Sequence, residues 1–143
     1  MKLRQISIFL ENRAGRSAEV IGVLGRAGVN IRAIALADTA DFGIIRLIVD
    51  KTDKALEALK NEGITVKETQ VIAVEIPDRP GALAAILNIL GKAGINVEYL
   101  YGFLDRVEDK AIIVFRFEEL DHALRILTKE GYQVLNGSCV HGM

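Results

Sequence analysis

Residues 24–30 read Leu-Gly-Arg-Ala-Gly-Val-Asn, and residues 90–96 read Leu-Gly-Lys-Ala-Gly-Ile-Asn. The likeness extends outward from these two stretches. Residues 3–41 align without a gap onto residues 69–107, and residues 43–70 align onto residues 111–138. Self-similarity that keeps one register over so long a stretch indicates a duplicated structural unit. The sequence therefore predicts two copies of one fold, over residues 1–70 and 71–143.

Each copy carries the signs of four strands and two helices. The first strand of each copy shows the two-residue period of a half-buried strand, at residues 5–10 and 72–76. The first helix follows with apolar residues at helical spacing, and Gly28 or Gly94 stands where many helices end. Further strands are expected at 31–38 and 43–50 and, in the second copy, at 97–104 and 111–118. A second helix and a final strand complete each copy.

The order strand, helix, strand, strand, helix, strand predicts an α+β protein of two tandem ferredoxin-like βαββαβ units. Each unit should be a four-stranded antiparallel sheet with two helices on one face. The third strands carry apolar residues on both faces, and those predicted to point away from the helices are Ile44, Ile48, Ile112 and Val114. Units of about 70 residues bury little surface alone. We therefore expect this face to pack against another sheet or strand edge, within the chain, between chains or both.

Composition excludes several classes of protein. The 143 residues include 18 basic and 19 acidic ones, so electrostatics gives no reason to expect a nucleic-acid or anionic-membrane partner. No apolar run is long enough to cross a bilayer, and no signal-peptide core is recognisable. Cys139 is the single cysteine, which rules out a disulfide framework and predicts a cytoplasmic protein.

The turn before the first helix of the second copy contains both prolines of the chain, Pro77 and Pro80. Pro80 fixes its own φ angle, and Gly81 permits a close approach of other groups. The helix that begins here offers unpaired N–H groups and partial positive charge to a carboxylate. Asp78 can receive an ammonium group, and Asn96, after the same helix, offers both a donor and an acceptor. The turn favours an amino-acid ligand, although Asp-x-Pro-Gly is also a common capping turn.

The βαββαβ unit, the Asp-Arg-Pro-Gly-Ala-Leu turn at 78–83 and the Ala-Gly-Ile-Asn-Val junction at 93–97 resemble an ACT domain. Together the two copies resemble the stand-alone tandem ACT proteins. The resemblance implies a non-catalytic regulatory protein that binds an amino acid where paired units meet. The ligand-binding residues that it implies in the second copy are Asp78, Arg79, Pro80, Gly81, Ala82, Leu83 and Asn96. In the first copy they are Asn12, Arg13, Ala14, Gly15 and Asn30.

The first copy departs from this pattern. Ala14 replaces the proline, Asn12 replaces the acid, and Arg16 adds positive charge. A neutral and more flexible turn should receive an ammonium group less well. Either the first site has lost its ligand or it completes a site centred on the second copy, and we take the second copy as the principal binder.

The second strands also differ between the copies. Small residues in the first copy stand where the second copy has large aromatic ones, and the pairs are Ala33 with Tyr99, Ala35 with Tyr101 and Ala37 with Phe103. Structural packing explains this pattern most simply. The alternative is that Tyr99 or Tyr101 lines the ligand pocket and favours an apolar or aromatic ligand side chain.

Other functions find weaker support. A metal site would need the scattered residues His122, His141 and Cys139, and Cys139 lacks the third group of a catalytic set. No phosphate loop or dinucleotide fingerprint is present, so no cofactor is expected. Phe115 and Phe117 should face the helices, which argues against RNA binding. The main competitor is a ligand-free dimerisation or interaction module. We expect a homodimer in either case, with an enzyme or transporter as the regulated partner.

Overall fold

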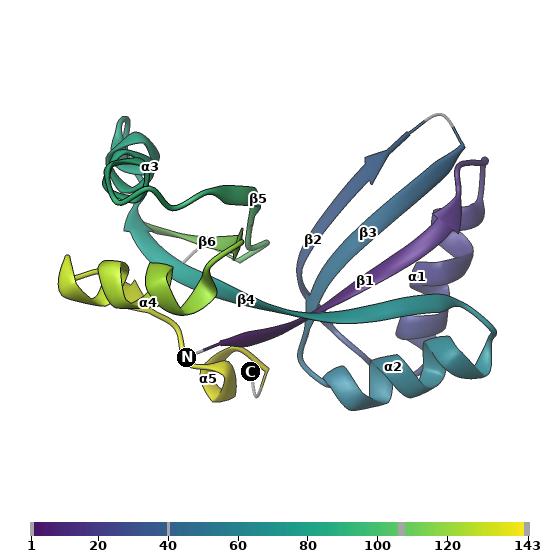
Figure 1. Cartoon of the computed structure of the whole chain (residues 1–143). Helices are drawn as coiled ribbons and strands as arrows, with labels where there is room; N and C mark the ends of the chain where they lie inside the picture. Colours follow the sequence, from purple (N-terminus) through teal and green to yellow (C-terminus); the bar gives the residue numbers. More distant parts are fainter. Residues whose placement is uncertain (1, 40, 106–107, 142–143) are drawn as a thin grey trace. The chain divides into compact units, whose positions relative to one another are not determined.

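The computed structural model describes residues 2–39, 41–105 and 108–141, without the side chains of residues 139 and 141 (Figure 1). The chain forms two compact units. The first unit comprises residues 4–69 together with the C-terminal segment from Ser138. The second unit comprises residues 70–137 together with the N-terminal segment up to Leu3. Each unit thus contains most of one copy of the repeat, together with a short terminal segment of the other copy.

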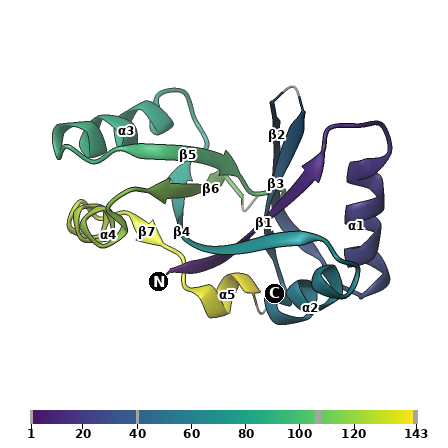
Figure 2. The same cartoon turned by 45° about the vertical axis from the view of Figure 1, so that its right-hand side comes forward.

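The first unit is built from β1 (Leu3–Glu11), α1 (Arg16–Arg26), β2 (Ile31–Asp38), β3 (Phe42–Val49) and α2 (Thr52–Asn61). The first part of β4 (Thr65–Pro77) completes its sheet, whose strand order is β2-β3-β1-β4. Strand β3 runs antiparallel to both β1 and β2, with Ile45 opposite Ile8. Figure 2 shows α1 and α2 on the same side of these strands.

The second unit repeats this plan with the rest of β4, α3 (Ala82–Lys92), β5 (Val97–Gly102), β6 (Lys110–Phe117), α4 (Leu120–Lys129) and β7 (Gln133–Val134). Its strand order is β7-β4-β6-β5, and all three pairings are antiparallel. A short helix, α5 (Gly137–His141), follows. Strand β4 closes the sheet of the first copy and opens that of the second. The predicted tandem ferredoxin-like fold is confirmed.

Each unit has its own hydrophobic core between its helices and one face of its sheet. In the first unit Leu24 of α1 and Leu59 of α2 are buried against Leu47 of β3. In the second unit Phe115 and Phe117 of β6 are fully buried, with ring centroids 5.4 Å apart. Both phenylalanines lie in the helix-backed core, as the alternation along this strand predicted.

Part of the opposite face of each sheet is also buried. Ile48, Ile112 and Val114 are 0%, 6% and 0% exposed although they belong to neither helix-backed core. The β1 residues that alternate with the core include a buried polar pair. Gln5 Nε2 donates to Ser7 Oγ at 3.3 Å. This polar pair was not expected from the sequence. Among the described residues, no helix is long and apolar enough to cross a membrane.

Candidate ligand-binding turns

The two turns that lead into α1 and α3 have the same backbone structure. The N–H of Arg16 donates to the carbonyl of Arg13 at 3.2 Å, and the N–H of Ala82 donates to the carbonyl of Arg79 at the same distance. These four residues occupy equivalent places in the two copies. The replacement of Pro80 by an alanine in the first copy has therefore not changed the hydrogen bonding of the turn.

Each turn is also fixed to the loop before the third strand of its own copy. The N–H of Asn12 donates to the carbonyl of Asp41 at 3.1 Å, and the N–H of Asp78 donates to the carbonyl of Asp109 at 2.7 Å. The backbone N–H of this residue, Asn12 or Asp78, therefore holds both turns in one orientation. The hydrogen bond does not involve the side chain, so the side chain can be an amide in the first copy and a carboxylate in the second.

A glycine in the left-handed region precedes each helix. Gly15 has a φ angle of 84° and Gly81 one of 87°, and neither helix has a side-chain hydrogen bond at its N-cap in the described chain. A left-handed φ is costly for residues other than glycine. The N–H groups of the first helical turn lack partners within the helix and carry partial positive charge. Both turns therefore have the backbone of an anion-binding corner.

The second turn carries an arginine, Arg79, that has no partner among the described side chains. Asp78, Arg79 and Pro80 are exposed, Ala82 is buried at the base of α3, and Leu83 is half-buried. The Arg79 guanidinium forms no ion pair or hydrogen bond with any described residue of the chain. An arginine and the N-terminus of α3 thus lie within one short turn, and the Asp78 carboxylate lies next to them in sequence.

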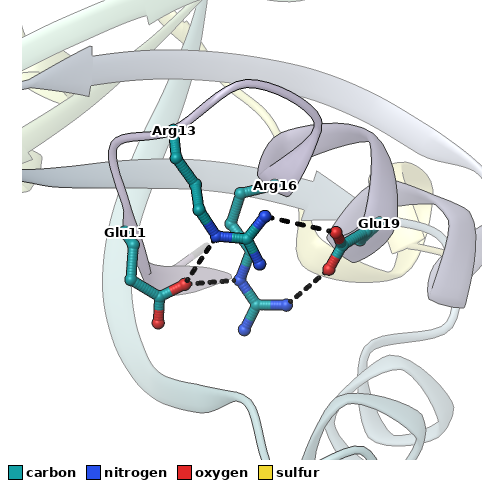
Figure 3. Close-up of polar contacts among 4 residues, drawn as sticks. All are labelled: Glu11, Arg13, Arg16 and Glu19. Atoms are coloured by element: carbon teal, nitrogen blue, oxygen red, sulfur yellow. Dashed lines mark hydrogen bonds and ion pairs between the residues drawn. The ribbon is translucent and has the colours of Figure 1, made fainter.

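The first turn is electrostatically different, because two glutamates neutralise its arginines (Figure 3). Arg16 Nε lies 2.9 Å from Glu11 Oε2, and Arg16 Nη1 lies 3.1 Å from Glu19 Oε2. Arg13 Nη1 lies 3.5 Å from Glu19 Oε1, and Arg13 Nε lies 3.8 Å from Glu11 Oε2. We call these four residues the first-turn ion cluster. The predicted excess of positive charge at this turn is therefore compensated within the chain.

The ion cluster also changes the acidity of Glu19. The hydrogen bond from Arg16 and the charge of Arg13 lower the pKa of the Glu19 carboxyl group below its usual value. Glu19 therefore stays ionised and paired at neutral pH. The extra arginine was expected from the sequence but its acidic partners were not, although the three-residue spacing between Arg16 and Glu19 is that of neighbours on a helix surface.

The polar side chain of Asn12 is engaged within the first copy. Its Nδ2 group donates to Asp38 Oδ2 and to the carbonyl of Thr39, both at 3.2 Å. A hollow of about 60 Å³ lies beside this turn. Its lining residues are Leu10, Glu11, Asn12, Arg13, Ser17, Leu36, Asp38 and Gly43.

The two asparagines that follow the first helices lie at the far ends of those helices. Asn96 comes after α3, whose eleven residues span about 16 Å at 1.5 Å per residue. The equivalent Asn30 donates its backbone N–H to Asp50 Oδ1 at 2.9 Å, and its carbonyl accepts from the N–H of Asp50 at 3.1 Å. Within one copy, the structure thus separates the turn from the asparagine that was expected to share its ligand.

Tyr99 lies on β5 opposite Arg116, and Tyr101 lies opposite Val114. Their rings stack with centroids 6.5 Å apart. Both tyrosines lie on the face of the sheet opposite the helix-backed core. Tyr101 is buried and Tyr99 is half-buried. A β-bulge between Val97 and Tyr99 sets this arrangement, because it lets Val97 face the core while both tyrosines face away from it.

The described residues contain no group of three or more side chains suited to hold a metal ion. His122 has an acidic neighbour, since its Nδ1 lies 3.9 Å from Glu119 Oε2. The side chains of Cys139 and His141, the other two residues considered for a metal, lie outside the described part of the chain.

The duplicated fold, with one glycine-capped turn in each copy, defines the class of tandem ferredoxin-like domain proteins. Residues 1–140 match the description "ACT domain pair". The chain belongs to this family, which is regulatory and non-catalytic.

Individual relatives agree with this assignment. Protein BT0572 from Bacteroides thetaiotaomicron is 37% identical, with a TM-score of 0.92 over 100% of this chain and 98% of that one. The ligand-free regulatory subunit of aspartate kinase from Thermus thermophilus shares the fold, with 20% identity and a TM-score of 0.64 over 90% and 92% of the two chains. The acetolactate synthase small subunit of Buchnera aphidicola subsp. Baizongia pistaciae is 39% identical over 49 residues. This match spans 34% of our chain and 31% of that relative.

Proposed function

We propose that this protein is a non-catalytic regulatory protein that binds an amino acid at the second turn and modulates a partner protein. One observation carries this proposal. The two turns share their backbone structure, yet the first turn has its arginines paired with Glu11 and Glu19, whereas Arg79 has no acidic partner in the described chain. A ligand carboxylate would supply that partner and would also accept from the amides at the start of α3.

The ligand class follows from the charges around the second turn. The α-carboxylate would lie against Arg79 and the N-terminus of α3, and the ammonium group would lie near Asp78. Pro80 and Gly81 would hold the corner in place, and Ala82 and Leu83 would offer apolar surface to the ligand side chain. In this proposal the half-buried Tyr99 remains a candidate for the same pocket.

The site is proposed to be shared between units. Because the length of α3 separates Asn96 from the turn of its own copy, one ligand cannot contact both within that copy. We propose that the asparagine comes from another unit, either in the same chain or in a second chain. A homodimer would provide such pairs, with Asn30 or Asn96 of one unit facing the turn of another.

The regulated partner is proposed to be an enzyme or a transporter. Two similar proteins are described as the regulatory subunit of aspartate kinase and as the small subunit of acetolactate synthase, so both belong to larger enzymes. The single cysteine of our chain fits a role in the reducing cytoplasm.

A thermal-shift screen against the twenty amino acids tests the proposal. A ligand that binds the native state at one hundred times its dissociation constant adds about 2.7 kcal/mol of stability. We expect one or a few amino acids to raise the melting temperature, and Asp78→Ala to abolish the rise. Asn12→Ala, the equivalent change in the first turn, is the matched control and should keep it. No stabilisation at millimolar ligand would instead favour a ligand-free interaction module.

Single substitutions can give each turn the charge pattern of the other. Ala85 occupies in α3 the place that Glu19 occupies in α1, and it is exposed. Ala85→Glu would place an internal carboxylate near Arg79 and should weaken binding of the screened amino acid roughly fivefold, equivalent to about 1 kcal/mol for an exposed ion pair.

Glu19→Ala is the reciprocal change in the first turn. It should allow acetate, used as a carboxylate probe, to shift the amide resonances of Ser17 and Ala18. Unchanged binding in Ala85→Glu, together with no acetate response in Glu19→Ala, would show that the ion cluster does not distinguish the turns.

A further inference from the structure

The two ends of the chain each belong to the unit that the other copy mainly builds. The N-terminal segment up to Leu3 belongs to the second unit, whereas the rest of β1 belongs to the first. The C-terminal segment from Ser138 belongs to the first unit, whereas the residue before it belongs to the second. We call residues 2–3 the N-terminal strap and residues 138–141 the C-terminal strap. The chain thus passes from one unit to the other near both ends as well as at the junction of the two copies.

The second unit fixes the point from which the C-terminal strap starts. Strand β7 pairs with β4, with Val134 opposite Val74. The N–H of the next residue, Leu135, donates to the carbonyl of Ala73 at 2.9 Å. Only Asn136 separates this hydrogen bond from the first residue of α5. The sheet of the second unit therefore holds the start of α5 within a short and defined distance.

The C-terminal strap is attached to the first unit by an apolar side chain. Val140 is 1% exposed, whereas Ser138 at the start of the strap is exposed. Helix α5 has only five residues, and a helix of this length is not stable in water without packing contacts. Because the strap belongs to the first unit, we assign the burial of Val140 to that unit. The helical form of the strap therefore depends on a unit that the second copy does not build.

The N-terminal strap makes the reciprocal connection. Leu3 is fully buried, and Lys2 Nζ lies 2.7 Å from Oδ1 of Asp121 in the first turn of α4. The hydrogen bond from Lys2 lowers the pKa of the Asp121 carboxyl group below its usual value. Two residues further on, Arg4 Nη2 lies 2.7 Å from Oδ1 of Asp53, the residue of α2 that is equivalent to Asp121. Both aspartates are mostly exposed, so these ion pairs add little stability and the burial of Leu3 supplies most of the attachment.

We propose that the two straps make the stability of each unit depend on the folding of the other. A folded second unit holds α5 close to its place in the first unit and so gives the strap a high effective concentration there. When the second unit opens, α5 loses this anchor and the first unit loses part of its stability. The dependence is partial, because each unit keeps its own helix-backed core. This inference does not rest on the proposed ligand.

Hydrogen exchange of the full chain, measured by mass spectrometry, tests the straps through single substitutions. Val140→Asp should speed exchange of the β3 amides in the first unit roughly tenfold or more, while the β6 amides of the second unit change little. Val140→Ala should give a smaller effect in the same unit, which keeps the test open if the aspartate variant does not fold. Ser138→Asp, at an exposed residue of the same helix, is the control and should leave both units protected. Leu3→Ala should speed exchange in β6 more than in β3.

A longer connection to α5 separates the anchoring of the strap from its packing. Insertion of about ten glycine and serine residues between Asn136 and Gly137 should speed exchange in β3 several-fold, because effective concentration falls as a tether lengthens. The same residues added after Met143 leave the connection unchanged and should have no effect. Wild-type protection of β3 in the insertion variant would overturn the proposed dependence of the first unit on the second. So would a Val140→Asp variant that loses protection only in β6.

Discussion

Replacing Phe117 by alanine is expected to lower the free energy of unfolding of the second unit by about 3–5 kcal/mol. The side chain is fully buried in the core beneath α3 and α4, and its ring lies nearly parallel to that of Phe115, at 8°. Removal of the ring loses its transfer free energy and leaves a cavity that the surrounding strands and helices can fill only in part. This is the largest stability effect that we expect from one substitution in the chain.

Hydrogen exchange measured by mass spectrometry can assign the loss to one unit. Each unit has its own core, so amides of β6 should lose protection in Phe117→Ala while amides of β3 keep most of theirs. Val49 occupies the equivalent place in the first unit and is also fully buried. Val49→Ala is the matched control and should cost about 2 kcal/mol, from two deleted methyl groups and a small cavity, in the first unit. Equal loss of protection in both units for either variant would mean that the two cores unfold as one.

Gly81→Val is expected to abolish ligand-induced stabilisation and to cost about 1–3 kcal/mol of stability in the absence of ligand. Gly81 has a φ angle of 87°, and a Cβ atom added there would meet nothing within 4 Å. The cost is therefore conformational and not a steric clash. A β-branched residue would draw the backbone out of the left-handed region and turn the first amides of α3 away from the corner. The thermal-shift assay with the amino acid found in the screen measures this loss.

Gly15→Val provides a closely matched control for that measurement. Gly15 has a φ angle of 84° with the same open surroundings, so valine should impose a similar strain on the first turn. If the second turn is the binder, Gly15→Val should lower the melting temperature by a similar amount and keep the ligand-induced rise. Loss of the rise in Gly15→Val alone would move the site to the first turn. Loss in both variants would indicate a site that needs a turn from each copy.

Much of the fold could be predicted from the sequence because periodicity is a local property. The alternation around Ile72 and Val74 and the helical spacing of Leu24 determine which side chains can share a core, whatever the rest of the chain does. Because the chain contains two copies of the unit, each of these patterns occurs twice in the sequence. The same local chemistry identified Gly15 and Gly81 as turn residues, and both have the positive φ angle that glycine accommodates.

The β-bulges show where local patterns reach their limit. A strict two-residue period would place Val97 and Tyr99 on the same face of β5. The register shift between them separates these side chains, and an equivalent shift lies between Ile31 and Ala33 in the first copy. A bulge depends on the pairing of one strand with its neighbour, so it has no clear signature in the sequence of a single strand.

Duplication, the order of elements, the side chains that face each core and the glycine corners were determined by the sequence alone, since each follows from a local pattern or from comparing the two copies. Tertiary structure decided which charges meet. It brought Arg4 within 2.7 Å of Asp53 and 2.8 Å of Glu68, and it placed Glu11 beside Arg16 in the first turn. It also placed Asn96 a helix length from the turn that it was expected to serve. Ion pairs act over a few ångströms, so they follow from positions in space, which spacing along the chain does not determine.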